Sequence, residues 1–305
     1  MTLLTLKYFI EAINAGSISL AAKNLFIAQP SLSKALKELE AEVDLQLFIR
    51  HPKGISLTDD GAEFLGYARQ IVEQATLLEE RYSNKAPRRR LCAISAQHYA
   101  FVVRAFANMV KKVDTSEYEF TLRETRTHEI FDDVKNWRSE IGVIYTNPFN
   151  EKVIHSLLKE NRLAFKPLFT AKPHIFTGAF SPLAKKKAVT LDDLTEYPYL
   201  SYEQGSYNSF YFSEEMQSTV SRKKNIRVND RATMFNLMIA LNGYTISSGL
   251  INSDLNGNDI VAIPLLVDDI MTVGYIVNAS ISLSRAATLF LNELNAVIDE
   301  YGYSL

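Results

Sequence analysis

The chain has 305 residues, carries 33 Lys and Arg against 35 Asp and Glu for a formal net charge of −2, and is 47% hydrophobic. This length suggests two or three domains, and the composition excludes a disordered chain. The charge balance gives no overall basic signature for coating nucleic acid, but it is compatible with a small DNA-reading module on a mildly acidic protein. The single cysteine, Cys92, excludes an intrachain disulfide and is typical of a cytoplasmic protein. No apolar run approaches the roughly 18 residues of a membrane span, and no signal peptide is expected.

Residues 1–58 are predicted to form three short helices and a two-stranded ribbon. Leu6, Phe9 and Ile13 recur at helical spacing, and Gly16 ends the first helix. Pro30 suits the first turn of the third helix, because the N–H that proline lacks has no partner there in any case. The buried stripe of this helix is predicted to be Leu32, Ala35, Leu36, Leu39 and Val43. Residues 47–57 are predicted to turn at 52–54, as the wing of a winged helix does.

Small polar and cationic side chains occupy the start and exposed side of the third helix and continue into the ribbon. Gln and Lys can hydrogen-bond base edges, and Ser can serve bases or phosphates. The alternative is an ordinary polar helix face, which is common on any protein. The candidate DNA-binding residues are Gln29, Pro30, Ser31, Ser33, Lys34, Lys37, Arg50, His51 and Lys53.

A long helix is predicted over residues 59–84. Thr58 and Asp59 offer a capping oxygen and first-turn negative charge. A heptad seam then indicates pairing with another helix, although a helix that lies on its own domain is the alternative. The seam residues are Phe64, Ala68, Ile71, Ala75, Leu78 and Tyr82. Residues 85–90 break the helix as a hinge, whose arginines are more typical of solvated charge than of a nucleic-acid patch.

After residue 90 the pattern changes to strands that alternate with helices. Such alternation predicts parallel-rich sheets with ligands at the carboxyl ends of the strands. Cys92 falls in a predicted buried strand and is expected to be an inert apolar residue. The predicted strands are 91–95, 118–122, 141–145, 174–177, 225–228, 244–247 and 271–278. The predicted helices are 98–112, 127–137, 208–220, 231–242 and 284–301.

Enzymatic motifs are absent from the sequence. It contains no Gly-rich phosphate loop, His-Glu-x-x-His site, Cys-x-x-Cys pair or Gly-x-Ser-x-Gly elbow. With five histidines and one cysteine, no metal site or other cofactor is expected. Two alternatives to a DNA-binding regulator stay open: a small-molecule binding protein whose N-terminal helices serve protein contacts, and an enzyme of unknown type.

Residues 1–58 resemble the N-terminal domain of LysR-type bacterial transcriptional regulators. The features that carry the resemblance, in order, are Phe9, Ala21-Ala22, Gln29-Pro30-Ser31-Leu32-Ser33, Leu39-Glu40, Leu47-Phe48-Ile49-Arg50 and Leu57-Thr58-Asp59-Asp60-Gly61. His51 and Pro52 are less usual in the wing of that family. The resemblance implies a winged helix-turn-helix domain at 1–58, a linker helix at 59–84, a hinge at 85–90 and an effector-binding domain at 91–305.

The C-terminal layout resembles the two-lobed fold of periplasmic binding proteins, so the predicted fold class is α/β with a helix-rich N-terminal domain. One lobe would comprise 91–165 and 266–305 and the other 166–265, with crossovers near 165–167 and 263–265. A small-molecule effector of unknown identity would bind between the lobes. The helix start after the first strand is expected to favour an anionic group of that ligand. The candidate effector-binding residues are Ser95, Gln97, His98, Arg126, Thr127, Tyr202, Ser206 and Asn208.

Two features of this domain have simpler alternatives. His98 could be a capping or solvent contact, and the aromatic run at 207–212 is expected to serve packing rather than a ligand pocket. As a whole, the sequence predicts a cytoplasmic, ligand-responsive DNA-binding regulator that is not an enzyme. Its dimer would pair through 59–84 and place two recognition helices on pseudo-palindromic DNA, and the family usually builds tetramers from two such dimers.

Overall fold

The computed structural model describes residues 1–52, 54–83, 90–114, 117–207, 209–251 and 257–303. It contains two compact units, Met1–Arg88 and Arg89–Leu305, and each is considered by itself. Lys53, Asn208 and residues 85–89 of the expected hinge lie outside the described residues.

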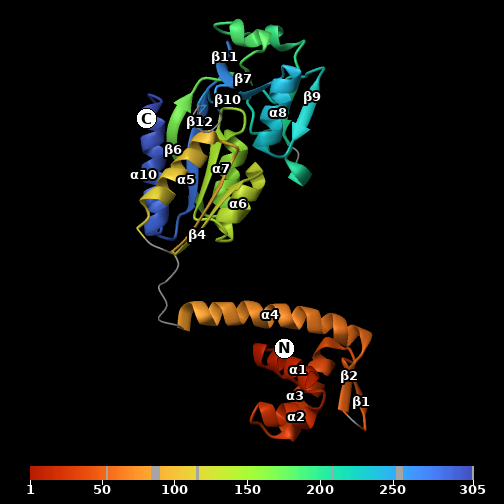
Figure 1. The fold of residues 1–305 in the computed structure, drawn as a ribbon. Coiled ribbons are helices and arrows are strands. Elements are labelled where there is room, and N and C mark those ends of the chain that lie inside the picture. The colour runs from red at the N-terminus through yellow and green to blue at the C-terminus, as the bar shows by residue number, and fades with distance from the viewer. Residues whose placement is uncertain (53, 84–89, 115–116, 208, 252–256, 304–305) are drawn as a thin grey trace. The chain divides into compact units, whose positions relative to one another are not determined.

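The first unit is a small helical domain with a two-stranded ribbon (Figure 1). A capping box between Thr2 and Thr5 begins the first helix, and Gly16 ends it at a φ of 69°. Phe9 lies in the centre of the core and contacts the rings of Phe48 and Phe64. The elements are α1 (Leu3–Ala15), α2 (Ile18–Asn24), α3 (Gln29–Val43), β1 (Phe48–His51), β2 (Gly54–Leu57) and α4 (Asp59–Ser83).

The ribbon is tied to the helices at several points. Glu40 on α3 accepts the N–H groups of Leu47 and Phe48 with one carboxylate oxygen, at 2.8 and 3.1 Å. The N–H of Ile55 donates to the carbonyl of Gly16, which joins β2 to the end of α1. A Cβ on Gly61 would lie 2.2 Å from the carbonyl oxygen of Leu47, so only glycine allows α4 to begin this close to the ribbon.

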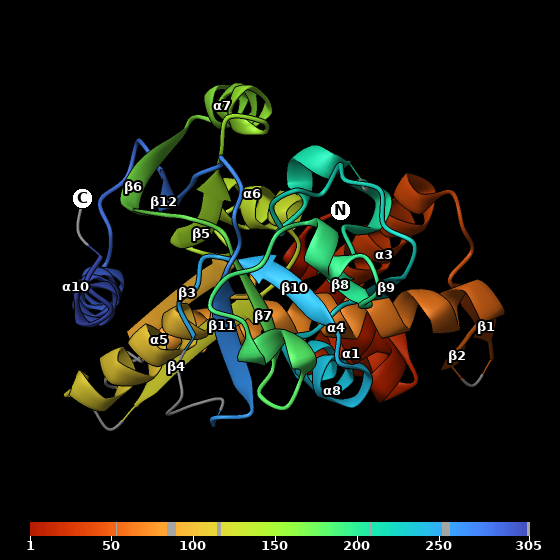
Figure 2. The same cartoon turned by 90° about the horizontal axis from the view of Figure 1, so that it is seen from above.

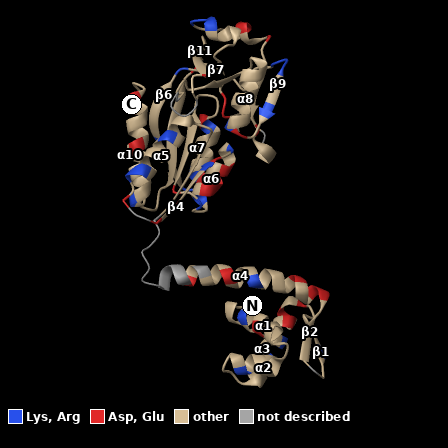
Figure 3. Cartoon of the chain, in the orientation of Figure 1, with Lys and Arg blue, Asp and Glu red and all other residues tan. Residues whose placement is uncertain are grey.

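The helix α4 uses only part of its apolar surface within its own unit. Leu65 and Ala68 are buried, and Phe64 packs against the same core. Further along, Ile71 is 47% and Leu78 58% exposed. Acidic side chains cluster in its first turn (Figure 3), where they face the positive end of the helix dipole.

The second unit contains two five-stranded sheets. The first has the strand order β4-β3-β5-β12-β6, in which β3 pairs in parallel with β4 and β5, and β12 runs antiparallel to β5 and β6. Figure 2 shows α6 and α7 on one side of this sheet and α5 and α10 on the other. The elements are β3 (Arg90–Ala96), α5 (Ala100–Lys112), β4 (Tyr118–Glu124), α6 (Thr127–Lys135), β5 (Ile141–Thr146), α7 (Glu151–Glu160), β6 (Leu163–Ala171), β12 (Met271–Asn278) and α10 (Arg285–Glu300).

The second sheet has the order β11-β7-β10-β8-β9 and carries α8 against its buried face. Short 3-10 helices make up much of the remaining chain in this lobe. The strands are β7 (His174–Gly178), β8 (Tyr199–Tyr202), β9 (Asn225–Val228), β10 (Tyr244–Ser247) and β11 (Ile260–Pro264), and the helices are η1 (Pro182–Lys185), η2 (Asp192–Leu194), η3 (Gly205–Tyr207), η4 (Phe210–Phe212) and α8 (Arg231–Leu241).

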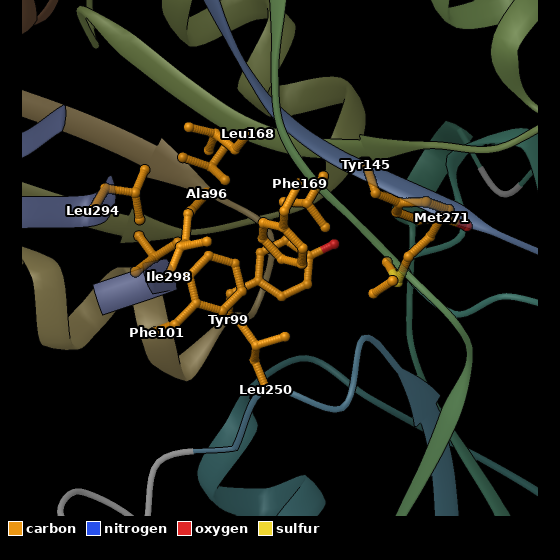
Figure 4. Close-up of a cluster of buried hydrophobic side chains, with 14 of the residues drawn as sticks. Ala96, Tyr99, Phe101, Tyr145, Leu168, Phe169, Leu250, Met271, Leu294 and Ile298 are labelled. Carbon is orange, nitrogen blue, oxygen red and sulfur yellow. The ribbon is translucent and has the colours of Figure 1, made fainter. Parts of the chain in front are cut away.

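A single buried apolar cluster runs through both lobes. Phe101, Phe169 and Met271 of the first lobe belong to it together with Leu250 and Ile246 of the second. Figure 4 shows Leu250 beside Phe101 and Tyr99. The two lobes are therefore packed against each other through a shared core rather than joined only by the crossing chains.

The structure differs from the predicted layout in three respects. The first lobe extends past the predicted boundary at 165, because β6 pairs with β12 from Leu163 to Ala171, and the crossing segment follows β6. The predicted helix at 208–220 is wrong: among the described residues of this segment there is only η4 and a series of turns. In this segment, Glu214 and Glu215 point inward and accept the backbone N–H groups of His98 and Tyr202. Two neighbouring side chains of a surface helix could not both reach these buried N–H groups. The helix α7 had not been predicted.

Candidate functional sites

The helix α3 presents one polar face and one buried face. Leu32, Leu36 and Leu39 are buried on the core side. On the other side, five of the candidate residues are exposed: Gln29, Pro30, Ser31, Lys34 and Lys37. The sixth candidate, Ser33, is half-buried. Lys34 lies 3.7 Å from Glu38, an exposed ion pair that contributes little and leaves the ammonium available to an incoming phosphate.

The ribbon adds Arg50 and His51, both exposed. The His51 Nε2 atom lies 2.8 Å from the hydroxyl oxygen of Ser56 on the opposite strand, which orients the ring along the ribbon. Because Glu40 fixes the start of β1, the ribbon is held in place relative to α3. The third candidate of the ribbon, Lys53, lies outside the described residues.

The turn before α3 contains a feature that sequence reasoning missed. Phe26 is 96% exposed and adopts a φ of 55°, in the left-handed region. A fully exposed aromatic side chain costs hydrophobic free energy unless a partner covers it. The N-cap residue of α3 is Ala28, so no side chain caps the first N–H groups of this helix. An aromatic residue in the turn and an uncapped helix start are therefore both presented next to the polar face.

In the second unit, the helix start predicted to attract a ligand anion is occupied by the protein itself. Glu214 Oε2 accepts the backbone N–H of His98 and lies 2.9 Å from His98 Nδ1. The ring of His98 stacks on Tyr202 from the other lobe, with centroids 3.8 Å apart. His98 and Tyr202 are thus brought together as expected, but the carboxylate beside them belongs to Glu214.

The turn before α6 is filled in the same way. The Thr127 N–H donates to Gln204 Oε1 at 3.1 Å, and the Arg126 guanidinium pairs with Glu203. The Thr127 hydroxyl donates to the carbonyl of Phe212 at 2.8 Å and accepts from Gln97 Nε2 at 2.7 Å. Arg126 and Thr127 therefore bind the chain of the second lobe at Glu203, Gln204 and Phe212, and Gln97 supports them through Thr127.

Two other candidates are not placed in the cleft. Ser95 is fully buried, and its hydroxyl donates to Asp133 Oδ2 at 2.7 Å and lies 2.8 Å from Ser139, so it joins β3 to α6 and the turn that follows. Side chains alternate along a strand, and Ser95 points to the α6 side of the sheet rather than to the second lobe. Ser206 is exposed in η3 and does not line the cavity described next. Asn208 lies outside the described residues.

A narrow cavity lies between the start of α5 and the second sheet. It has about 30 Å³ of free space, room for a water molecule or two. Sequence reasoning missed several of its polar lining residues. The predicted helix at 208–220 hid two of them, one lies within the predicted strand at 244–247, and one was assigned only to the start of the helix at 231–242. These residues are Glu214, Glu215, Arg231 and Thr245.

Burial perturbs the ionisable groups of this cavity. Burial, reinforced by the charge of Glu214, raises the pKa of Glu215 to about 8. Burial alone would lower the pKa of His98, but the charge and hydrogen bond of Glu214 outweigh it, so the pKa of His98 is raised. Perturbed groups in a cleft are typical of functional sites.

Within the ranges that the structure describes, no group of three or more His, Cys, Asp or Glu could hold a metal ion. None of the described helices is long and apolar enough to cross a membrane.

Two protein-family models match the chain. The model of the bacterial regulatory helix-turn-helix protein of the lysR family matches residues 3–62, and the model of the LysR substrate binding domain matches residues 86–299. The winged helix-turn-helix domain followed by a two-lobed α/β domain is thereby confirmed. The proteins of the family that these models describe are transcriptional regulators and not enzymes.

Curated relatives agree with the family models. The uncharacterized HTH-type transcriptional regulator YvbU of Bacillus subtilis is 26% identical over 217 residues, 69% of each chain. The HTH-type transcriptional regulator CysL of the same organism is 26% identical over 226 residues, 72% of this chain and 71% of that one. The nitrogen assimilation regulatory protein nac of Klebsiella aerogenes is 43% identical over 74 residues, 24% of each chain. Among solved structures, a cysteine mutant of OxyR from Corynebacterium glutamicum is 17% identical, covers 98% of this chain and 93% of its own, and has a TM-score of 0.51, a likeness in fold.

Proposed function

Because the chain belongs to the LysR family of bacterial transcriptional regulators, we propose that it binds pseudo-palindromic operator DNA through α3 and the ribbon and responds to a small molecule held between its C-terminal lobes. The family assigns the DNA-binding and effector-binding domains. The operator, the residues and the assembly belong to the proposal.

The observation that carries the DNA-binding part is the two-sided character of α3. Its leucines are buried, while Gln29, Lys34 and Lys37 are exposed on the opposite face. The exposed residues offer amide and ammonium donors for base edges and phosphates. Arg50 and His51 on the ribbon are then available to the neighbouring phosphates or the minor groove, and Phe26 to an apolar contact such as a thymine methyl group.

For the assembly, we propose that α4 pairs with α4 of a second copy. Tyr67, Ile71 and Leu78 are 61%, 47% and 58% exposed and follow one face of the helix at spacings of four and seven residues. Pairing there would give the two-fold symmetry that a pseudo-palindromic operator requires. Two such dimers would form the tetramer that is usual in this family, in the bacterial cytoplasm where operator DNA is accessible.

The effector is proposed to bind at the boundary of the lobes, where His98 stacks on Tyr202 and, one turn away along the same boundary, Thr127 binds the carbonyl of Phe212. A ligand that binds one arrangement of the lobes more tightly than another would shift the population between them. Such a shift would change the spacing of the DNA-binding domains in the assembly.

The test is a pull-down of sheared genomic DNA on the purified protein, with competition by bulk DNA at physiological salt, followed by sequencing. We expect enrichment of a few sites that contain an inverted repeat. Salt-sensitive binding to all DNA without an enriched site would contradict sequence-specific recognition, since phosphate contacts alone give that behaviour.

A further inference from the structure

The cavity between the lobes collects buried polar atoms that lack a partner. Among the described residues, six buried side-chain atoms make no hydrogen bond, and three of them belong to residues that line this cavity. They are Glu215 Oε2, Arg231 Nη1 and Thr245 Oγ1. Buried polar groups are nearly always paired, because an unpaired one costs free energy. Three in one place indicate a site whose missing partners come from outside the protein, from water in the cavity or from a ligand that replaces it.

Three carboxylates lie in or beside this cavity, and the nearby cation Arg222 donates to the carbonyls of Gln217 and Val220 and to the Tyr244 hydroxyl rather than to any of them. Glu124 Oε1 lies 3.2 Å from Arg231 Nη2, and Glu214 lies 2.9 Å from His98 Nδ1. Glu215 is 2% exposed and has no ion-pair partner among the described residues. Its Oε1 atom accepts the N–H of Tyr202 at 2.8 Å, while Oε2 accepts nothing. A buried carboxylate of this kind is best stabilised by a donor that carries positive charge.

The same geometry disfavours an anionic ligand group at the start of α5. Glu214 already accepts the His98 N–H and contacts the His98 ring, so a ligand carboxylate would have to displace Glu214. An incoming ammonium group instead finds Glu215 Oε2 without a protein partner, so it displaces the carboxyl proton and no side chain.

We infer that the effector carries a protonated amino group, which donates to Glu215 Oε2. This inference rests on the effector site proposed above. Arg231 Nη1 and Thr245 Oγ1 remain for an acceptor on the ligand, and Phe176, Met234 and Phe235 form an apolar wall for its body. The cavity as described has room for only one or two water molecules, so the body of the ligand enters only when the lobes move apart. An amino acid and a simple amine both carry this amino group. Only the amino acid also has a carboxylate, which would bind Arg231.

Two matched sets of probes separate these sources by titration calorimetry on the full-length protein. The first set is leucine, isopentylamine and isocaproate, and the second is phenylalanine, phenethylamine and hydrocinnamate. We expect binding by members that carry the amino group and none by the two acids. Tighter binding of the amino acid than of its amine would assign the ligand carboxylate to Arg231, and equal binding would identify an amine.

The variant Glu215→Gln keeps the shape and an acceptor for the Tyr202 N–H but removes the charge. It should weaken binding of the amino compounds roughly ten- to a hundredfold. The matched control is Glu196→Gln, in the same lobe at a side chain that is 77% exposed, which should bind like the wild type. Unchanged affinity of the Glu215→Gln variant would overturn the inference.

A second readout needs no variant. Near neutral pH, burial holds Glu215 largely protonated. Its charged and titratable neighbours are Glu214, Arg222, Tyr99, Tyr145, Tyr199 and Tyr202, with His98 and Arg231 on the same cavity and Glu124 paired to Arg231. Binding of an ammonium group should ionise Glu215 and release about one proton. Calorimetry in two buffers of different ionisation enthalpy measures this release. Binding of the amino compounds without proton release would contradict the assignment of Glu215 as acceptor.

Two outcomes would overturn the inference that the effector carries an amino group, without deciding whether the proposed effector site exists. Binding by the acids but not the amino compounds would show that a ligand anion replaces Glu214. Failure of every amino compound in both sets would exclude primary amines of this size. The proposed function itself fails separately, through the absence of an enriched operator in the DNA pull-down.

Discussion

Replacing Glu215 by glutamine should make the effector domain less sensitive to alkaline pH. The carboxyl is almost fully buried, and burial together with Glu214 raises its pKa to about 8 from the ordinary 4.5. The folded state therefore binds a proton that the unfolded state has already released at neutral pH. By linkage, this group contributes stability that is fully present below about pH 4.5 and is lost as pH rises through about 8.

The magnitude follows from the two pKa values. Between them, the free energy of unfolding falls by about 1.4 kcal/mol per pH unit. From about pH 6 to about pH 9 the wild type should lose roughly 2–3 kcal/mol through this group, because the slope flattens once the folded-state carboxyl is itself ionised. His98, whose raised pKa acts with the same sign, titrates in both proteins and largely cancels in the comparison.

The assay is urea unfolding followed by tryptophan fluorescence. Trp137 is the only tryptophan of the chain and follows α6, so it reports on the effector domain alone. We expect the two proteins to have similar stability at about pH 6 and the Glu215→Gln variant to be more stable at about pH 9. The Glu196→Gln control should follow the wild type at both. Parallel losses of stability in wild type and Glu215→Gln would refute the reasoning that Glu215 is a protonated, buried carboxyl.

Four further predictions concern the rest of the chain. Lys34→Ala should weaken operator binding by roughly 1–3 kcal/mol in gel shifts if Lys34 makes a base contact, and unchanged affinity would remove it from the reading face. Ala28→Ser should add a side-chain cap to α3 and stabilise the N-terminal domain by roughly 1 kcal/mol in thermal unfolding, whereas no gain would mean that the serine hydroxyl does not reach the first N–H groups. Ile71→Glu combined with Leu78→Glu should convert dimers into monomers in light scattering and leave folding intact, and a persistent dimer would place the interface elsewhere. Ser95→Ala should destabilise the effector domain by roughly 1–3 kcal/mol because buried Asp133 loses a donor, and a loss of effector response at unchanged stability would restore Ser95 to the cleft.

The N-terminal domain could be predicted from sequence because its signals are local. Leu32, Leu36 and Leu39 mark the buried side of α3 by their spacing, and Pro30 marks its start. The exposed side follows by exclusion. What spacing could not provide is the role of Glu40, which looked like a solvated acid and instead fixes the ribbon through two backbone N–H groups.

The effector cleft was harder because its contacts join residues far apart in the chain. The helix start at His98 was predicted to attract an anionic group of the ligand, but nothing near it in the sequence indicates that Glu214, more than a hundred residues later, fills that place. Because side chains alternate along a strand, Ser95 must point to the opposite face of the sheet from its two neighbours in the chain. The sequence does not show which of the two faces meets the second lobe. The segment at 208–220 has the aromatic and apolar spacing of a helix, and the inward hydrogen bonds of Glu214 and Glu215 override that tendency.

The attachment of the ribbon has a consequence for how any signal can reach DNA. The carboxylate of Glu40, the carbonyl of Gly16 and the close approach at Gly61 hold helix, ribbon and the start of α4 as one piece. In the proposed complex, the distance between a base read by α3 and a phosphate held by the ribbon is therefore fixed before the protein binds DNA. An effector cannot alter which short sequence one such domain prefers. It can only alter which pairs of sequences, at which separation along the duplex, can be occupied together.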